Sequence, residues 1–371
     1  MKKKIQVVFV VVVLGILVLP IITFDTEAVI SEKENRNLAD RPLLFSDNRL
    51  NEKLFSEYSQ YFDDRFGGRQ FFIALNDFVQ VDLLQGNGKT FNNKAIKGRS
   101  GWFFYIFPSD GDNFADFYKI NLVSEEKLEN FQRNVENTLS WCNAQGIPCI
   151  FIICPNKHSV YSEFYPFERP DGKTRSDQLI EVLQEVGADY VFSRDTMIVA
   201  KDENTDPLYY ETDTHWNQLG AYHTFNEFFP ILQSKFPNYK FPQIQYEIKT
   251  EYSTTFGDIL PMLGIEESPS TKPKLIPQDM MQEDLYKYIK NDDVNGVHTK
   301  GADETAPRAL VFRDSFFIAL EPFVSPLFSE TEYIWKRFEE SDKEYILEYK
   351  PDIIIFECVE RYFPDICYNV K

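Results

Sequence analysis

Uninterrupted apolar runs that alternate with helical patterns constrain the fold of this chain most strongly. The runs cover 147–154, 309–312 and 352–356. Strands that are apolar on both faces belong to parallel sheets that helices cover on both sides. The pattern therefore predicts an α/β fold of three layers (αβα) with a central, mainly parallel sheet.

The segments between these runs show the helical spacing of apolar side chains. Ser124 and Ser176 are the expected N-caps of two helices, and Gly146 and Gly187 are the glycines expected to end them. A third helix is expected over 218–235. Two shorter strands complete the expected sheet, over 190–192 and 332–335.

The N-terminus has the pattern of a membrane anchor. Three lysines at 2–4 precede an uncharged run over 5–24, and a bilayer-spanning helix needs about 20 mainly apolar residues. A cleaved signal peptide, the alternative, ends at a small-residue site that 25–28 match poorly. Because lysines next to a span stay in the cytoplasm, we expect a single-pass signal anchor in the cell membrane, with the bulk of the chain extracytoplasmic.

The rest of the chain divides by its composition. We expect a juxtamembrane and helical lead-in over 25–90, with helical spacing over 51–85, and an enlarged α/β domain over 91–371. Within this domain, 240–305 is rich in Pro, Ser, Thr and charge, and it has little periodicity. We expect a loop-rich insertion there, at the rim of the functional site.

Charge and cysteine content narrow the classes of partner. A formal net charge of −19 argues against nucleic acid as a partner. The five cysteines cannot all pair within one chain, and they lack the Cys-x-x-Cys spacing of zinc and redox sites. Whether Cys358 and Cys367 form a disulfide stays open. We expect no metal and no tightly bound cofactor.

Two short segments offer the groups of a serine acyl-transfer centre. Asp213 and His215 lie two residues apart, and Ser315 follows the apolar run 309–312. In such a centre, Asp orients the imidazole, His takes the serine proton, and Ser attacks the acyl carbon. Each segment alone is weak support, because Asp and Ser also favour turns and helix caps.

Three further residues are candidate substrate contacts. Lys157 follows the run 147–154, where it binds either a sugar hydroxyl or a structural carboxylate. Trp216 either stacks on a sugar or packs beside the Asp-x-His turn. Arg361 belongs either to a structural ion pair with neighbouring glutamates or to the substrate site.

A resemblance to a known family spreads along most of the chain beyond the anchor. The residues that carry it lie in 34–36, 64–66, 98–104, 155–157, 213–217, 257–259, 314–316 and 357–361. They resemble the SGNH-hydrolase-like domain of the AlgJ/AlgX type of alginate O-acetyltransferase, and the related DHHW proteins. Ordinary SGNH enzymes have the serine first, whereas this family and this chain have Asp-x-His first, a permuted order. Arg313 departs from the glycine that some relatives carry before the Asp-Ser pair.

The resemblance implies an O-acyltransferase, with acetyl as the expected group and a cell-surface or exported polysaccharide as the acceptor. A membrane acyltransferase of the MBOAT type would supply the acyl group, which Ser315 would carry as an ester. Three alternatives stay open: a carbohydrate acetylesterase, a D-alanyl-transfer protein of teichoic acid modification, and a non-catalytic polysaccharide-binding scaffold.

Overall fold

The computed structural model describes residues 24, 26, 30–31, 36–46, 49–51, 54–65, 90–91, 94–253, 257–263, 270–278, 280–292 and 296–367. The chain forms two compact units, one of 1–92 with 260–267 and one of 93–259 with 268–371. The expected anchor lies outside the described residues except for Phe24. Among the helices in the described part of the chain, none is long and apolar enough to span a bilayer.

The first unit contains one complete described helix, most of a short helix that begins at Ile259, and short strand pairs. The pairs are β1 (Ile30–Ser31) with β2 (Arg36–Asn37) and β3 (Phe45–Ser46) with β4 (Arg49–Leu50); β5 is Thr90–Phe91 and the helix is α2 (Leu54–Arg65). The C-terminal end of α2 is tied to the segment before it, because Ala39 donates its N–H to Asp64 and accepts a hydrogen bond from Arg65. Helix α2 confirms the start of the helical spacing expected over 51–85, and the rest of that stretch lies outside the described residues.

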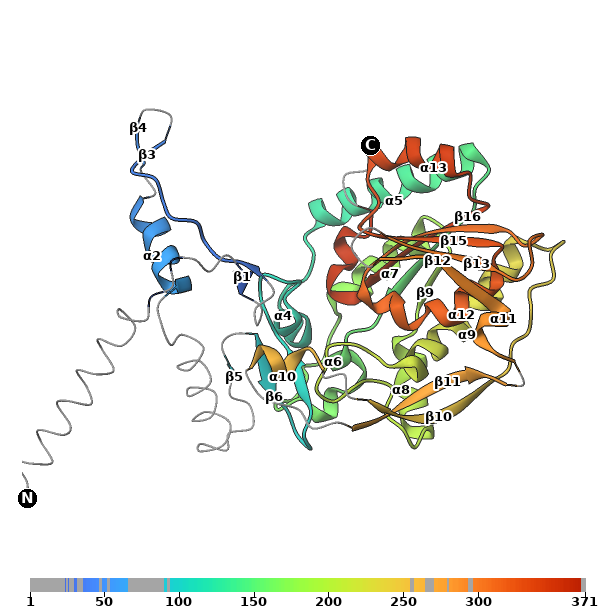
Figure 1. Cartoon of the computed structure of the whole chain (residues 1–371), viewed down its shortest axis with the longest axis horizontal. Helices are drawn as coiled ribbons and strands as arrows, with labels where there is room; N and C mark the ends of the chain where they lie inside the picture. The colour runs from blue at the N-terminus through green and yellow to red at the C-terminus, as the bar shows by residue number, and fades with distance from the viewer. Residues whose placement is uncertain are drawn as a thin grey trace, which may run out of the picture. The chain divides into compact units, whose positions relative to one another are not determined.

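A seven-stranded sheet forms the centre of the second unit, in the order β12-β13-β15-β14-β16-β8-β9 (Figure 1). The strands are β8 (Cys149–Cys154), β9 (Tyr190–Phe192), β12 (Tyr286–Asp292), β13 (Gly296–Gly301), β14 (Arg308–Arg313), β15 (Glu330–Trp335) and β16 (Ile353–Val359). The five from β15 to β9 are parallel, and β13 and β12 continue the sheet antiparallel at one edge. The expected α/β fold is confirmed, with a mixed sheet that is parallel over most of its width.

Alternate side chains of the central strands feed two separate cores. Ile150, Val311 and Ile355 belong to one core, and Phe151 and Phe312 belong to the other. Complete burial of such a side chain contributes about 1.5–3 kcal/mol, so strands that are apolar on both faces stabilise helices on both faces. In Figure 1, α5 and α13 lie above the sheet, and α9 and α12 lie below it. The three expected layers are therefore present.

The helices of the second unit cover these two cores. They are α4 (Asn113–Tyr118), α5 (Glu125–Gln145), α6 (Lys157–Val160), α7 (Arg175–Glu185), α8 (Arg194–Glu203), α9 (Gln218–Lys235), α11 (Gln282–Leu285), α12 (Glu321–Val324) and α13 (Lys343–Tyr349). A further short helix, α10, covers Ile259–Met262, and short 3₁₀ turns follow β14 and β16 as η3 (Ser315–Ala319) and η6 (Glu360–Asp365).

The predicted bounds of the helices now labelled α5 and α9 are confirmed, and the predicted N-cap of α7 is wrong. Ser124 and Gly146 flank α5 as expected, and α9 has the predicted bounds. Ser176 is not the cap of α7. Thr174 takes that place: its hydroxyl oxygen accepts the backbone N–H of Asp177, and the Asp177 carboxylate accepts the backbone N–H of Thr174, which completes a capping box. Gly187, with φ of 68°, follows the end of that helix.

The loop-rich insertion expected over 240–305 is corrected by the structure. β10 (Tyr246–Ser253) pairs with β11 (Ser270–Pro277) as an antiparallel ribbon, and β12 and β13 join the edge of the central sheet. The buried positions of β13 include Thr299 and Gly301, which give no apolar signal. In β10, apolar residues alternate with charged ones from Tyr246 to Lys249, which is a strand period, but the run is short and few side chains of the ribbon are buried, so the signal is weak.

The five cysteines are buried and carry free thiols. Cys149 and Cys154 begin and end β8, and Cys358 lies in β16. Cys358 and Cys367, left open by the sequence, are therefore not bridged in this structure.

Candidate active site

The carboxyl ends of three neighbouring parallel strands build the site. Ser315 follows β14, Arg361 follows β16, and Lys157 follows β8. The Asp-x-His turn precedes α9 and is closed by a bridge between Tyr209 and Trp216. Ligands of open α/β sheets bind beyond such strand ends.

Ser315, His215 and Asp213 form a continuous line of hydrogen bonds. The Ser315 hydroxyl lies 2.7 Å from His215 Nε2, and His215 Nδ1 lies 2.6 Å from Asp213 Oδ1. Asp213 Oδ1 also accepts the backbone N–H of His215 at 2.8 Å, which fixes the turn. The structure thus brings together the three residues singled out by sequence, with the connections of a Ser-His-Asp arrangement.

The charges of this line support one another. Burial opposes ionisation of Asp213, but hydrogen bonds from His215 and the charge of His215 outweigh it and lower the pKa of Asp213 to about 2. Burial lowers the pKa of His215, but its hydrogen bond with Asp213 and the charge of Asp213 outweigh burial, so the net pKa of His215 is raised. The imidazolium that forms when His215 takes a proton as a general base is therefore stabilised.

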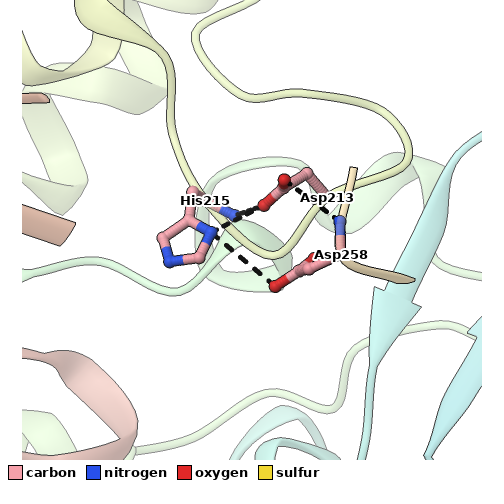
Figure 2. A group of neighbouring side chains, drawn as sticks. All are labelled: Asp213, His215 and Asp258. Carbon is pink, nitrogen blue, oxygen red and sulfur yellow. Dashed lines mark hydrogen bonds and ion pairs between the residues drawn. The ribbon is translucent and has the colours of Figure 1, made fainter. Parts of the chain in front are cut away.

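A second carboxylate, Asp258, lies beside the same imidazole (Figure 2). Its Oδ2 is 3.7 Å from His215 Nδ1, and its backbone N–H donates to Asp213 Oδ2 at 3.2 Å. The carboxylate accepts the backbone N–H of Thr214 at 2.7 Å and the Thr214 hydroxyl at 2.5 Å. Burial, and then the charge of Asp213, raise the pKa of Asp258.

Sequence reasoning missed Asp258 as a site residue. The available signal was its place in the Gly257-Asp258-Ile259 segment of the family pattern. Gly257 permits the close approach of the Asp258 segment to Thr212, because a Cβ at Gly257 would lie 2.4 Å from the carbonyl oxygen of Thr212.

The same three residues have the spacing of cation ligands. One ligand atom from each of Asp213, His215 and Asp258 lies within 4.8 Å of the others. In this arrangement, however, Nδ1 is engaged by Asp213.

The turn that carries Ser315 is fixed by Asp314. This carboxylate accepts the backbone N–H groups of Phe316 at 2.9 Å and Val359 at 2.8 Å, and Arg337 lies 3.1 Å away. Ser315 is the first residue of η3, where a backbone N–H has no acceptor within the helix. That N–H is therefore a candidate donor to an oxyanion.

The bulky Arg313 is accommodated in the core beside this turn. Its side chain is fully buried, with the guanidinium 4.5 Å above the Trp335 ring and 3.5 Å from Glu321. The departure from glycine at this position therefore leaves the line of hydrogen bonds intact.

A pocket of about 310 Å³ opens onto the reacting groups. It is lined by Tyr210, Asp213, His215, Trp216, Gln218, Ser315, Phe316, Ile318 and Ala319. A larger cavity of about 530 Å³, beside α5 and α7, contains none of the three aligned residues. The smaller pocket is the candidate site because it holds the nucleophile and base together.

The remaining candidates have structural partners. Trp216 is 1% exposed and donates its Nε1–H to the carbonyl of Phe316 at 2.8 Å, so it packs beside the turn and offers no ring face to a sugar. Arg361 lies 4.0 Å from Asp110 and over the rings of Tyr105, Phe316 and Tyr362. This matches the ion-pair alternative, although the expected glutamate partners are replaced by Asp110.

Among the described residues, no carboxylate lies in hydrogen-bond contact with Lys157, so the expected structural carboxylate is not its partner. Its side chain is buried, and its ammonium donates to three backbone carbonyls of the Asp-x-His turn. It is absent from the lining of the pocket, so the structure gives it no direct contact with a ligand there.

Comparison with known proteins gives a family match and several fold likenesses. Residues 95–294 match the family described as "SGNH hydrolase-like domain, acetyltransferase AlgX". PatB1 of Bacillus cereus, solved with a sulfonyl adduct, is 15% identical, with a TM-score of 0.56 over 75% of this chain and 98% of that chain. The O-acetyltransferase domain of Pseudomonas putida AlgJ is 17% identical, with a TM-score of 0.49 over 73% of this chain and 92% of that chain. No curated protein matched.

The family match covers more than half of the chain, 200 residues (95 to 294 inclusive) of 371. It contains Asp213, His215 and Asp258, while Ser315 lies beyond it and joins them through the fold. The chain therefore belongs to the family of AlgX-type SGNH-hydrolase-like domains.

Proposed function

We propose that this protein is an extracytoplasmic O-acyltransferase that moves an acetyl group to a hydroxyl of a cell-surface or exported polysaccharide. The observation that carries the proposal is the line of hydrogen bonds from Ser315 through His215 to Asp213 at the mouth of a pocket. The acetyltransferase description of the family supports acetyl as the group transferred.

The first half of the reaction forms an ester on Ser315. His215 Nε2 takes the hydroxyl proton as Ser315 Oγ attacks the acyl carbonyl, and Asp213 stabilises the resulting imidazolium. The backbone N–H of Ser315 donates to the developing oxyanion. The imidazolium then returns its proton to the leaving group of the acyl donor, and the acetyl group remains on Ser315.

The second half transfers the group to the acceptor. A polysaccharide hydroxyl gives its proton to His215 Nε2 and attacks the ester carbonyl. When the tetrahedral intermediate collapses, Ser315 leaves and recovers that proton from the imidazolium. Net charge and protons balance over the cycle, so no metal or redox group is required by this scheme.

Membrane partners belong to the same proposal. The run over 5–24 would anchor the chain with its bulk outside the cell. An MBOAT-type acyltransferase in the same membrane would supply the acyl group from the cytoplasmic side. The family resemblance supports this partner.

The test uses the purified full-length protein with an activated acetyl ester and an oligosaccharide. A transferase yields acetylated sugar, and an esterase yields acetate alone. Ser315→Ala and His215→Ala should each lower transfer by about 10³-fold or more, with the double variant little worse, because such groups act as one unit. Ser234→Ala, at an exposed serine of α9 that bonds only to its own helix, is the matched control.

The same variants decide between catalysis and a scaffold role in cells. Acetylation of the exported polymer should fall to background with a stably expressed Ser315→Ala protein. Wild-type acetylation with that variant would exclude the acyl-serine route. D-alanyl ester in place of acetyl ester on the cell-surface polymer would favour the teichoic acid alternative.

A further inference from the structure

Lys157 is a buried cation whose hydrogen bonds, within the part of the chain that the structure describes, go to backbone carbonyls. It is 4% exposed, and Nζ donates to the carbonyl oxygens of Tyr210 and Glu211 at 3.1 Å and of Asp213 at 2.7 Å. An ammonium has three N–H donors, so all three are used on one turn. That turn carries the carboxylate that orients His215.

Two aromatic rings complete the surroundings of this ammonium. Nζ lies 5.5 Å from the ring centre of Trp102 and 5.2 Å from that of Phe104. A cation over ring faces is stabilised electrostatically, most strongly where water is excluded. Phe103 begins the short strand β7 (Phe103–Tyr105), which also contains Phe104 and directly follows Trp102. The backbone N–H of Phe103 donates to the carbonyl of Glu211 at 2.9 Å, so this segment also contacts the turn directly.

These contacts explain two segments of the family pattern that contain none of the three aligned residues Asp213, His215 and Ser315. The 98–104 pattern supplies the rings, and the 155–157 pattern supplies the lysine. Gly98 allows the backbone of the 98–104 segment to approach that of Phe164, because a Cβ at Gly98 would lie 2.3 Å from the carbonyl oxygen of Phe164. Both patterns converge on 210–213, next to the Ser315 pocket.

We propose that Lys157 is a positioning residue. Its ammonium donates to three carbonyls of the Asp-x-His turn and so keeps the Asp213 carboxylate in hydrogen-bond contact with His215. Three carbonyl oxygens that point at one place repel each other unless a cation lies between them. Without the ammonium the turn relaxes, and Asp213 no longer fixes the imidazole. The inference deepens the proposed acyl transfer and rests on it for the meaning of the aligned residues.

The charge state of Lys157 should therefore affect the site. Burial lowers the pKa of Lys157 to about 7, against the opposing charges of Asp213, Asp258 and Glu211, which face it. A neutral amine has two N–H donors and no charge, so it loses one carbonyl and the attraction to the rings. Because the clamping form is the protonated one, the clamp is complete at low pH and loosens as pH rises through this pKa.

The experiment measures the reactivity of Ser315 in the full-length protein, without any acceptor. Phenylmethylsulfonyl fluoride is added, and the rate of adduct formation on Ser315 is followed by mass spectrometry from pH 5 to 10. Lys157→Met should slow labelling by about 10²-fold, the scale of a small misplacement of catalytic groups. The wild type should label more slowly as pH rises through the pKa of Lys157, and Lys157→Met should lose this alkaline fall in rate, because the titrating amine is gone.

The low-field proton resonance of His215 Nδ1–H gives a second readout. It reports the hydrogen bond to Asp213 and should weaken or vanish in Lys157→Met while thermal unfolding remains cooperative. Lys157→Gln keeps two neutral donors, and it should label at a rate between those of Lys157→Met and the wild type. Lys201→Met is the matched control, since Lys201 also donates to a backbone carbonyl and lies over a tyrosine ring, away from the pocket.

Wild-type labelling with an unchanged pH profile in folded Lys157→Met would overturn the proposal. If that variant does not fold, the same result in Lys157→Gln overturns it equally. Failure of acetyl transfer by a wild-type protein that labels normally would instead contradict the proposed function and leave the role of Lys157 standing.

Discussion

Two carboxylates, those of Asp213 and Asp258, lie beside Nδ1 of His215, and they set the pH response of the site (Figure 2). The imidazole must be neutral to accept the serine proton, and its pKa is raised because Asp213 outweighs the effect of burial. We expect labelling of Ser315 to rise with pH through a midpoint above 6.5, the ordinary value for histidine. Asp213→Asn should move the midpoint down and lower the rate by about 10⁴-fold. A midpoint that does not move would show that Asp213 does not interact with the titrating imidazole.

Asp258 gives a second, finer prediction at the same scale. Its charge also raises the pKa of His215, though less than Asp213 does. Asp258→Asn should shift the acid midpoint to lower pH, with a smaller loss of maximal rate than Asp213→Asn, because the main orienting bond remains. The measurement is the same pH series on Ser315 labelling. An equal loss in both variants would mean that Asp258 shares the orienting role.

The residues found by sequence and those missed differ in how their contacts are encoded. Asp213 and His215 are two residues apart, and Ser315 follows an apolar strand, so local pattern and known chemistry identified all three. Asp258 was not named as a site residue, and Lys157 was named as a candidate substrate contact, without its bonds to the Asp-x-His turn. Asp258 reaches Asp213 across 45 residues, and Lys157 reaches Asp213 across 56. Such contacts depend on how the turn is folded, and local spacing in a single sequence does not show them.

At the scale of elements, α9 starts directly behind the Asp-x-His turn, so its cap affects both stability and the site. Asn217 accepts the N–H groups of Leu219 at 2.9 Å and Gly220 at 3.2 Å. Asn217→Ala should cost about 1 kcal/mol of unfolding free energy for the lost N-cap bonds, and more in total, because it also removes the hydrogen bond that the Asn217 amide donates to the carbonyl of Pro207. Ser124, the N-cap of α5, makes no side-chain cap bond, so Ser124→Ala should cost clearly less.

Chemical denaturation of the two variants checks this comparison. Equal losses would show that backbone preference, rather than the cap hydrogen bond, stabilises the start of α9.

Helices α5 and α9 could be predicted because a long apolar period remains recognisable despite local exceptions. Strands β10 to β13 could not, because edge and ribbon strands bury few apolar side chains and their buried positions include Thr299 and Gly301.

At the scale of the whole molecule, the N-terminal run connects the chain to its expected site of action. Phe24, the last residue of the run, packs against Tyr61 and Phe62 of α2 with ring centres 5.8 and 5.6 Å apart. Of these rings, that of Tyr61 carries the polar tip that favours the headgroup level of a bilayer. If 5–24 cross the membrane, the contact of Phe24 with α2 places this helix next to the end of the span.

The proposed topology predicts that protease added to intact cells removes the ectodomain. Lysines at 2–4 should keep the N-terminus inside. The bulk of the chain should then be exposed to the medium, in Gram-negative cells after the outer membrane is opened. The fragment that remains in the membrane should retain Met1, since an uncleaved anchor keeps its N-terminus. A cytoplasmic marker protein that stays intact is the control for lysis.

Replacing the three lysines by glutamate should reduce the fraction of molecules with this orientation and so protect part of the population from the protease. Full protection of the wild-type ectodomain would contradict the topology and remove the physical basis for an extracytoplasmic acceptor, and an N-terminus beginning near residue 25 would show cleavage instead of anchoring.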